Sequence, residues 1–285
     1  MTHVALIGAG LMGTGLARLF TAHGMSVSIY DANWAALDAL VTAVPAAKPA
    51  LSLSDAVRQA DLVIEAVSER LDLKQSIFAD LAAATSATTI LATNSSVIAV
   101  GAITAHLNDA SAARCVGTHF WNPPDLIPLV EVIEGPRTTA ATVATTMAIM
   151  IAAGKDPVHV HRDTVPGNRL QHALWREAIA LVEEGVCAPE DVDKLVKRSF
   201  GLRLPVLGPL ENADLVGLEL TKAIHDVVLP TLSRATSAST LLSERIVGGA
   251  TGVAAGRGFY DNWTEERIAD VRARLAEHLA RLLDR

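Results

Sequence analysis

Residues 117–135, GTHFWNPPDLIPLVEVIEG, place a histidine and a glutamate in a largely apolar stretch. His119 ends the β-rich run CVGTHF, and Glu131 follows twelve residues later within LVEVI. A neutral imidazole, whose ordinary pKa is about 6.5, can take the proton from an alcohol. A carboxylate beside it would hold its tautomer and stabilise the imidazolium. The spacing alone fits equally well a hydrogen-bonded core histidine and an edge-strand glutamate, so both interpretations stay open at this point.

A glycine-rich motif near the start of the chain predicts a dinucleotide site. HVALIGAGLMGTGLARLF reads G-x-G-x-x-G between a strand and a helix. Such glycines allow a tight turn, close approach of the backbone to a pyrophosphate, and packing of the helix on the strand. We expect the cofactor to contact Gly8, Gly10, Leu11, Met12 and Gly13.

Asp31 ends the second β-rich run, SVSIYD. A carboxylate there accepts hydrogen bonds from an adenosine ribose and repels a 2′-phosphate, which predicts NAD rather than NADP. A tight glycine turn with a capping aspartate is the structural alternative. The strand, the helix and the carboxylate are all in register, and this favours the cofactor site.

The elements that must position these residues fall into two halves. Up to about residue 160, short β-rich runs alternate with alanine-rich segments at helical spacing, which is typical of βαβ units and a parallel sheet. After Asn168 only amphipathic helical stretches follow, broken by Gly and Pro. The pattern predicts an α/β chain: a Rossmann-type, doubly wound parallel sheet in residues 1–164, then an all-helical domain for substrate binding and dimerisation in residues 165–285.

Composition excludes several other classes of protein. The net charge of −7 is not gathered in a basic stripe, so we expect no nucleic-acid partner. Neither a signal peptide nor a membrane span is evident, and two isolated cysteines fit a reducing compartment, so we expect a cytoplasmic protein. His159 and His161 share one face of the strand PVHVH. No third ligand is evident near them in the sequence, so we interpret both as solvent-facing and predict no metal.

The chain resembles the 3-hydroxyacyl-CoA dehydrogenase family from end to end. The resemblance is carried, in order, by GAGLMGTG, VIEAVSERLDLKQSIF, ATNSS, GTHFWNP with LVEVI, NRLQHALWREAIALVEEG, GPLENADLVGLEL and GRGFYD. It implies a Rossmann domain followed by a helical dimerisation domain. It also implies oxidation of a secondary hydroxyl beside an acyl group, with NAD as the cofactor.

The resemblance also assigns roles to single residues. It makes His119 the base and Glu131 its partner, places a substrate-binding hydroxyl at Ser96, and makes Asn168 a donor to the developing carbonyl oxygen. Without it, Ser96 would be an ordinary turn serine and Asn168 an N-cap. Further cofactor contacts are implied for Glu69, Lys74 and Asn122.

Several departures from the family pattern concern the substrate. Only DANWAALDALVTAVPAAKPALSLSDAVRQA separates the second strand from the run LVIEAV, so the long helical arm that grips CoA is missing. Ala254 stands where the family has a lysine, and Pro128 where a cationic residue is common. Positive charges suited to phosphates have been lost. The segment DTVPGNR before the helical half, which contains Asn168, is also shortened.

Three hypotheses for the function follow. The first is an NAD-dependent dehydrogenase that takes hydride from a hydroxyl-bearing acyl or carboxylic small molecule. The second is a related dehydrogenase that oxidises an aromatic aldehyde or alcohol, such as 5-formyl-3-hydroxy-2-methylpyridine-4-carboxylate, or an acyl group bound to a carrier protein. The third is a non-catalytic nucleotide-binding or structural protein, against which the retention of His119, Glu131 and Ser96 argues. We expect a homodimer, because Leu174, Trp175 and Ile179 share an apolar helix face.

Overall fold

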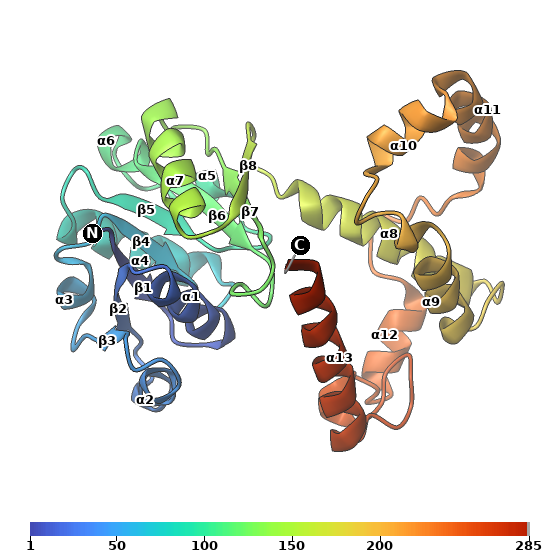
Figure 1. Ribbon diagram of the computed structural model, residues 1–285, viewed down its shortest axis with the longest axis horizontal. Coiled ribbons are helices and arrows are strands. Elements are labelled where there is room, and N and C mark those ends of the chain that lie inside the picture. Colours follow the sequence, from blue (N-terminus) through green and yellow to red (C-terminus); the bar gives the residue numbers. More distant parts are fainter. Residues whose placement is uncertain (284–285) are drawn as a thin grey trace. The chain divides into compact units, whose positions relative to one another are not determined.

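A computed structural model describes residues 1–283 and divides the chain into two compact units (Figure 1). The first unit is Met1–Asn168, and the second begins at Arg169. The boundary predicted from the sequence lay between residues 164 and 165. The first unit extends four residues further, and in this stretch Gly167 and Asn168 hydrogen-bond to Glu131 and Ser96.

The first unit is built on one eight-stranded sheet, in the order β3-β2-β1-β4-β5-β6-β7-β8. Its strands are β1 (His3–Ile7), β2 (Ser26–Tyr30), β3 (Lys48–Pro49), β4 (Leu62–Glu65), β5 (Ile90–Thr93), β6 (Cys115–Phe120), β7 (Leu129–Ile133) and β8 (Asp156–Val160). The order reverses at β1, whose neighbours are β2 and β4. Ligands of open α/β sheets bind beyond the carboxyl ends of the strands at such a point.

Two features of the sheet differ from the sequence prediction. β3 has only two residues, and the sequence has no β-rich run at this position. β7 runs antiparallel to β6, although every other pair in the sheet is parallel. The connection 121–128 is too short for the crossover that a parallel pair needs, so the chain turns back directly. The predicted fold class, a doubly wound and mostly parallel sheet, is confirmed.

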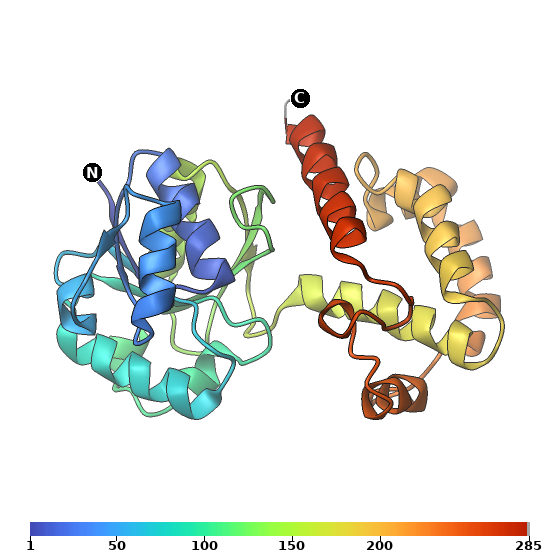
Figure 2. The same cartoon turned by 90° about the horizontal axis from the view of Figure 1, so that it is seen from below.

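Helices cover both faces of this sheet, as the two ribbon views show (Figure 2). They are α1 (Leu11–Ala22), α2 (Trp34–Ala43), α3 (Leu53–Val57), α4 (Leu71–Ala84), α5 (Val100–Ile103), α6 (Asp109–Ala112) and α7 (Ala140–Ala152). One core lies under α1, α2 and α7 and the other under α3, α4 and α5, with alternate strand residues pointing into each. Val4, Leu6 and Val132 point into the first core, and Ala5 and Ile133 into the second.

The second unit is helical, as predicted. It contains α8 (Pro166–Glu183), which begins in the first unit, followed by α9 (Pro189–Arg198), η1 (Phe200–Leu202), α10 (Pro209–Val216), α11 (Leu218–Val228), η2 (Leu229–Thr231), α12 (Thr240–Val247), η3 (Val253–Ala255) and α13 (Glu265–Leu283). Of its hydrophobic side chains described by the structure, only Val192 is buried. This unit therefore leaves much apolar surface open.

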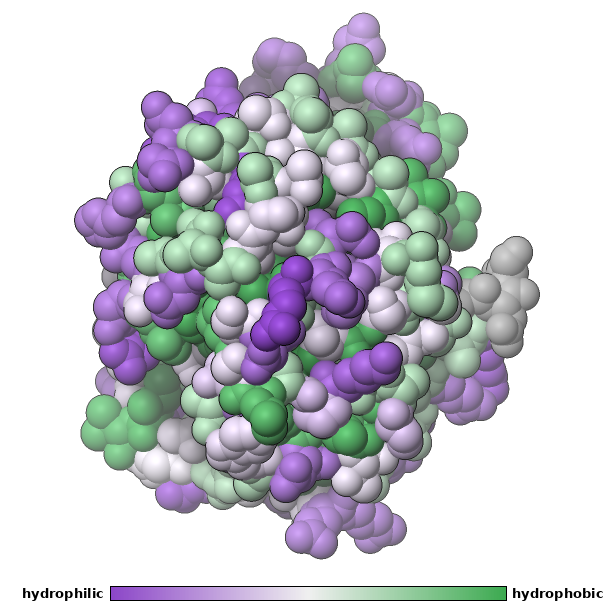
Figure 3. Space-filling model, turned by 90° about the vertical axis from the view of Figure 1, so that its left-hand side faces the viewer, coloured by the Kyte–Doolittle hydropathy of each residue, from purple (hydrophilic) through white to green (hydrophobic). Residues whose placement is uncertain are grey.

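Figure 3 shows one side of the first unit. On the side that carries α3, hydrophilic and hydrophobic side chains are interspersed (Figure 3). Within residues 1–283, no helix is both long enough and apolar enough to span a bilayer.

Candidate active site

The loop after β1 depends on glycine at two positions for different reasons. Gly8 has a φ of +111°, and a Cβ there would lie 2.6 Å from the carbonyl oxygen of Ala66. A Cβ on Gly13 would lie 1.9 Å from the carbonyl oxygen of Gly8, so α1 approaches the loop closer than any side chain allows. A Cβ on Gly10, by contrast, would have no protein atom within 4 Å. The backbone at Gly10 is thus left bare at the N-terminus of α1, where an anion is favoured.

A cavity of about 710 Å³ opens beside this loop at the reversal of strand order. Its walls include Gly8, Gly10, Leu11, Met12, Tyr30 and Asp31. Bare backbone at a helix N-terminus and a carboxylate at the end of β2 suit a pyrophosphate and an adenosine ribose respectively. The residues present therefore fit NAD.

Asp31 is fixed by the backbone on both sides. Its Oδ2 accepts a hydrogen bond from Ala9 N at 2.6 Å, and its Oδ1 accepts one from Asn33 N at 2.7 Å. These bonds join the glycine loop to the start of α2. Each carboxylate oxygen keeps a further lone pair for a ribose hydroxyl.

Glu69 and Lys74 belong to an ion-pair network. Lys74, 1% exposed, places Nζ 2.7 Å from Glu65 Oε1 and 3.2 Å from Glu69 Oε2. Thr93 Oγ1 and the Val67 backbone N–H also donate to Glu65. Neither Glu69 nor Lys74 is among the residues that line the cavity. Their contact with NAD, like that of the exposed Asn122, stays a prediction.

His119 and Glu131 face each other across the antiparallel pair β6 and β7. They are cross-strand neighbours, and His119 Nδ1 lies 2.6 Å from Glu131 Oε2. Both side chains are buried, with residue exposures of 4% and 2%. If Nδ1 carries the proton toward the carboxylate, Nε2 is the free basic nitrogen.

Glu131 is held in its charged form. Burial alone would raise its pKa, but hydrogen bonds from His119 and from the Gly167 backbone outweigh this, so the pKa lies below its usual range. The Gly167 N–H donates to Oε1 at 2.9 Å. One carboxylate oxygen thus orients the imidazole while the other ties down the start of α8.

Gly167 and Trp121 pack tightly around this pair. A Cβ on Gly167 would lie 2.5 Å from Trp121 Cζ2 and 3.2 Å from Glu131 Oε2. The Trp121 ring meets the His119 ring edge-on, with centroids 5.4 Å apart. Neither residue was predicted from the sequence. The sequence showed that the segment before Asn168 is shortened and contains Pro-Gly. It did not indicate that Gly167 packs closely against Trp121.

Asn168 and Ser96 are brought together beside the same pair. Asn168 Nδ2 donates to the backbone carbonyl of Ser96 at 2.8 Å. Asn168 is thereby placed one residue from the glycine that bonds to Glu131, despite the shortened segment before it. Ser96 is exposed, in the turn after β5. Asn94, which was not predicted from the sequence, accepts a hydrogen bond from Phe120 N at 3.0 Å and so holds the end of β6 against β5.

A Rossmann unit with a dinucleotide cavity and a separate buried His–Glu pair defines an NAD-dependent oxidoreductase. Two family models match the chain: the NAD binding domain of 3-hydroxyacyl-CoA dehydrogenase over residues 3–48 and 39–164, and the C-terminal domain of 3-hydroxyacyl-CoA dehydrogenase over residues 166–262. The chain belongs to the 3-hydroxyacyl-CoA dehydrogenase family. This confirms the family, the cofactor and the enzyme class expected from the sequence.

Individual relatives differ in the substrates that their names state. The 5-formyl-3-hydroxy-2-methylpyridine 4-carboxylate 5-dehydrogenase of Mesorhizobium japonicum is 34% identical, over 97% of this chain and 96% of its own. A crystal structure of an enzyme of that name, described as an NAD⁺-dependent dismutase, superposes with a TM-score of 0.92 at 31% identity, covering 98% of this chain and 96% of that one. The 3-hydroxyadipyl-CoA dehydrogenase of Escherichia coli is 35% identical over 94% of this chain and 60% of its own.

Proposed function

We propose that this NAD-dependent dehydrogenase acts on a small carboxylate that carries a hydroxyl or a hydrated aldehyde, rather than on a CoA ester. The observation that carries this proposal is the short path from β2 to β4. Only the ten-residue α2, the two-residue β3 and the five-residue α3 lie between these strands. The long helical arm that the family resemblance led us to expect for a CoA ester has no counterpart there.

The chemistry of the cysteines supports the hydrated form of an aldehyde. Oxidation of a free aldehyde through a thiohemiacetal needs an accessible thiolate. Cys115 is fully buried, and burial raises the pKa of its thiol to about 12. Cys187 belongs to the second unit, so the first unit, which contains His119, offers no accessible thiol. A hydrated aldehyde needs no thiol, because it is itself a hydroxyl compound.

The His–Glu pair would drive both versions of the reaction in the same way. His119 Nε2 takes the hydroxyl proton, and Glu131 stabilises the resulting imidazolium. NAD held beside Gly10 and Asp31 would supply the acceptor for the hydride that leaves the carbon bearing the hydroxyl. A secondary alcohol then yields a ketone, and a hydrated aldehyde yields a carboxylic acid. We assign Ser96 and Asn168 to contacts with the substrate oxygen, since they lie side by side next to this pair.

A substrate panel tests the proposal, and it has to detect dismutation. Free 3-hydroxy acids, the matching CoA thioesters and hydroxylated pyridine aldehydes with a ring carboxylate would be compared by NADH absorbance and by product analysis. Product analysis is essential because an enzyme that oxidises one aldehyde and reduces the next releases no net NADH. We expect free acids or ring aldehydes to have the higher kcat/KM. A higher kcat/KM for the CoA thioester than for its free acid would contradict the proposal.

We further propose a cytoplasmic homodimer in which the second unit forms the interface. Leu174 is 39% exposed and Trp175 is 50% exposed, in a unit whose described residues bury little hydrophobic surface. A second copy would cover this apolar area. Two free cysteines suit a reducing compartment. Light scattering at micromolar concentration should give twice the chain mass of 30.0 kDa. A monomeric mass would contradict the dimer.

Cofactor preference provides a prediction about Asp31. Asp31→Ser combined with Ala32→Arg, at an exposed neighbour that also lines the cavity, should shift the ratio of kcat/KM for NAD over NADP by at least about 100-fold toward NADP. The shift has two sources: the repulsion of the 2′-phosphate is lost, and a cation that binds it is added. Ala32→Arg alone serves as the control and should shift the ratio less. An unmodified enzyme that uses both cofactors equally would contradict the assignment of Asp31.

Gly167→Ala should lower turnover by about 10-fold or more while NAD affinity stays unchanged. The added methyl would overlap the Trp121 ring, so α8 must move and the hydrogen bond from Gly167 to Glu131 must lengthen. Trp121→Phe removes the overlapping atom. Turnover of the double variant should therefore exceed that of Gly167→Ala alone. If Trp121→Phe gives no such rescue, steric overlap is not the cause of the loss.

A further inference from the structure

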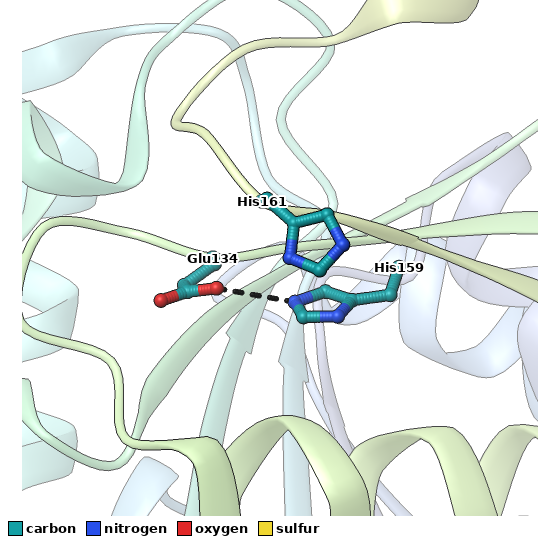
Figure 4. A group of neighbouring side chains, drawn as sticks. All are labelled: Glu134, His159 and His161. Atoms are coloured by element: carbon teal, nitrogen blue, oxygen red, sulfur yellow. Dashed lines mark hydrogen bonds and ion pairs between the residues drawn. The ribbon is translucent and has the colours of Figure 1, made fainter.

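A second group of side chains capable of chemistry lies at the edge of the sheet. Glu134, His159 and His161 converge there, and all their potential ligand atoms lie within 4.8 Å of one another (Figure 4). His159 Nε2 is already 3.2 Å from Glu134 Oε2, and the two histidine rings have centroids 4.0 Å apart. We propose that these three residues bind Zn²⁺ or a chemically similar divalent transition-metal ion.

The strand backbone fixes the positions from which the ligands project. β7 and β8 are parallel, with Val132 opposite His159 and Ile133 opposite Val160. Glu134 directly follows β7, and its N–H donates to the carbonyl of Val160 at 2.9 Å. Successive residues of a strand point to opposite faces, so His159, His161 and Glu134 share one face. Only side-chain torsions have to change to close the site around an ion.

The distances are close to what tetrahedral coordination requires. Zn–N and Zn–O lengths of about 2.0–2.2 Å put ligand atoms roughly 3.3–3.5 Å apart. The pair His159 and Glu134, at 3.2 Å, is just below that separation, and a shift of at most about 1.5 Å brings in the farthest ligand atom. The side chains of His159 and Glu134 are 29% and 37% exposed, so an ion can reach them while losing part of its hydration shell. Three protein ligands leave the fourth position to water.

The donor set selects the kind of ion. Two imidazole nitrogens and one carboxylate oxygen suit Zn²⁺ and its late first-row neighbours. Mg²⁺ and Ca²⁺ prefer sets made only of oxygen, such as carboxylates, carbonyls and water. The single carboxylate partly neutralises a divalent ion, and the imidazoles bind in their neutral form. Mg²⁺ is therefore a suitable negative control.

This site is separate from the His119–Glu131 pair. Glu131 is opposite Val158 and Val132 is opposite His159, so Glu131 and His159 point to opposite faces of the sheet. The ion would instead act on the edge strand β8, whose one neighbour in the sheet is β7. Coordination across the two strands would tie β8 in place. It would also fix the start of the segment that leads from His161 to Gly167.

Zinc titration of the full-length protein, first freed of metal with a chelator, tests the proposal. Calorimetry should show one Zn²⁺ bound per chain at micromolar concentration, with no binding of Mg²⁺. Co²⁺ should give the visible absorption band of a four-coordinate site. Glu134→Gln, His159→Ala and His161→Ala should each weaken Zn²⁺ binding by at least about 10-fold, since even groups beyond the direct ligands often contribute that much. Saturating Zn²⁺ should raise the Tm of the wild type but not of these variants.

Two control variants separate this site from other metal-binding groups. His106→Ala removes an exposed histidine of the same unit, and Cys187→Ser removes the less buried thiol. Both should bind Zn²⁺ like the wild type. NAD titration and the Tm without metal confirm that every variant is folded. Zn²⁺ binding that survives all three site substitutions, or that is lost in either control, would overturn the proposal.

Discussion

Replacing His119 with asparagine is expected to lower turnover by about 10²–10⁴-fold, the usual contribution of a positioned acid–base group, while NAD affinity stays nearly unchanged. Asparagine can still hydrogen-bond to Glu131, but it has no nitrogen that accepts a proton at neutral pH. His119 lies on β6, whereas the glycine loop and Asp31, which we assign to NAD binding, follow β1 and β2. The His119→Asn variant should therefore lose turnover without losing NAD affinity.

The measurement combines steady-state turnover on the best substrate of the panel with NAD titration of the same preparation. His106→Asn, an exposed histidine of the same unit, is the matched control and should retain full turnover. A His119→Asn variant with wild-type turnover would show that the imidazole is structural. Loss of NAD binding in that variant would show that the substitution disturbs the whole unit.

The second large effect is expected at Gly13. Gly13→Ala would set a methyl group 1.9 Å from the carbonyl oxygen of Gly8. The methyl is bonded directly to Cα and the oxygen belongs to the backbone, so neither can rotate away and α1 must move from the loop. Overpacking of this kind costs about 1–3 kcal/mol and sometimes more. We expect NAD binding to be lost as well, because the helix N-terminus no longer meets the pyrophosphate. Urea unfolding and NAD titration measure the two losses separately.

Gly10→Ala in the same loop is the matched control. No protein atom lies within 4 Å of the added methyl, and the φ of −73° suits alanine, so stability should be unchanged or slightly raised. NAD affinity should nevertheless fall, because the methyl would occupy the space that we assign to the pyrophosphate. Full NAD affinity in Gly10→Ala would show that the pyrophosphate does not lie here. A Gly13→Ala protein as stable as the wild type would contradict the packing of α1.

Local patterns in the sequence account for the confirmed predictions of the fold class and of NAD as the cofactor. The glycine loop, the aspartate after the second strand and the β-rich runs each depend on a few neighbouring residues. β3 could not be predicted, because a two-residue strand has no alternating pattern of hydrophobic and polar residues. The direction of β7 was not predicted, because parallel and antiparallel strands can have the same composition. The direction depends instead on the length of the connection that precedes the strand.

Side-chain contacts between neighbouring strands could not be predicted from the sequence alone. His119 meets Glu131 only because β6 and β7 pair in one register, and a slip of one residue would turn one partner to the other face. The family resemblance, not the spacing, pointed to that pair. Glu134 was missed beside His159 for the same reason: it lies 25 residues earlier, and the register of β7 on β8 brings it there.

The pH dependence of oxidation in the wild type and in Glu131→Gln tests the central claim most directly. A step in which a base takes the substrate proton should make the oxidation rate of the wild type rise with pH. Glutamine keeps the shape of Glu131 but does not stabilise the imidazolium, so the rise should begin at lower pH and reach a lower plateau. A half-maximal rate that stays at the same pH, or moves to higher pH, would contradict the assignment of His119 and Glu131 as a base and its charged partner.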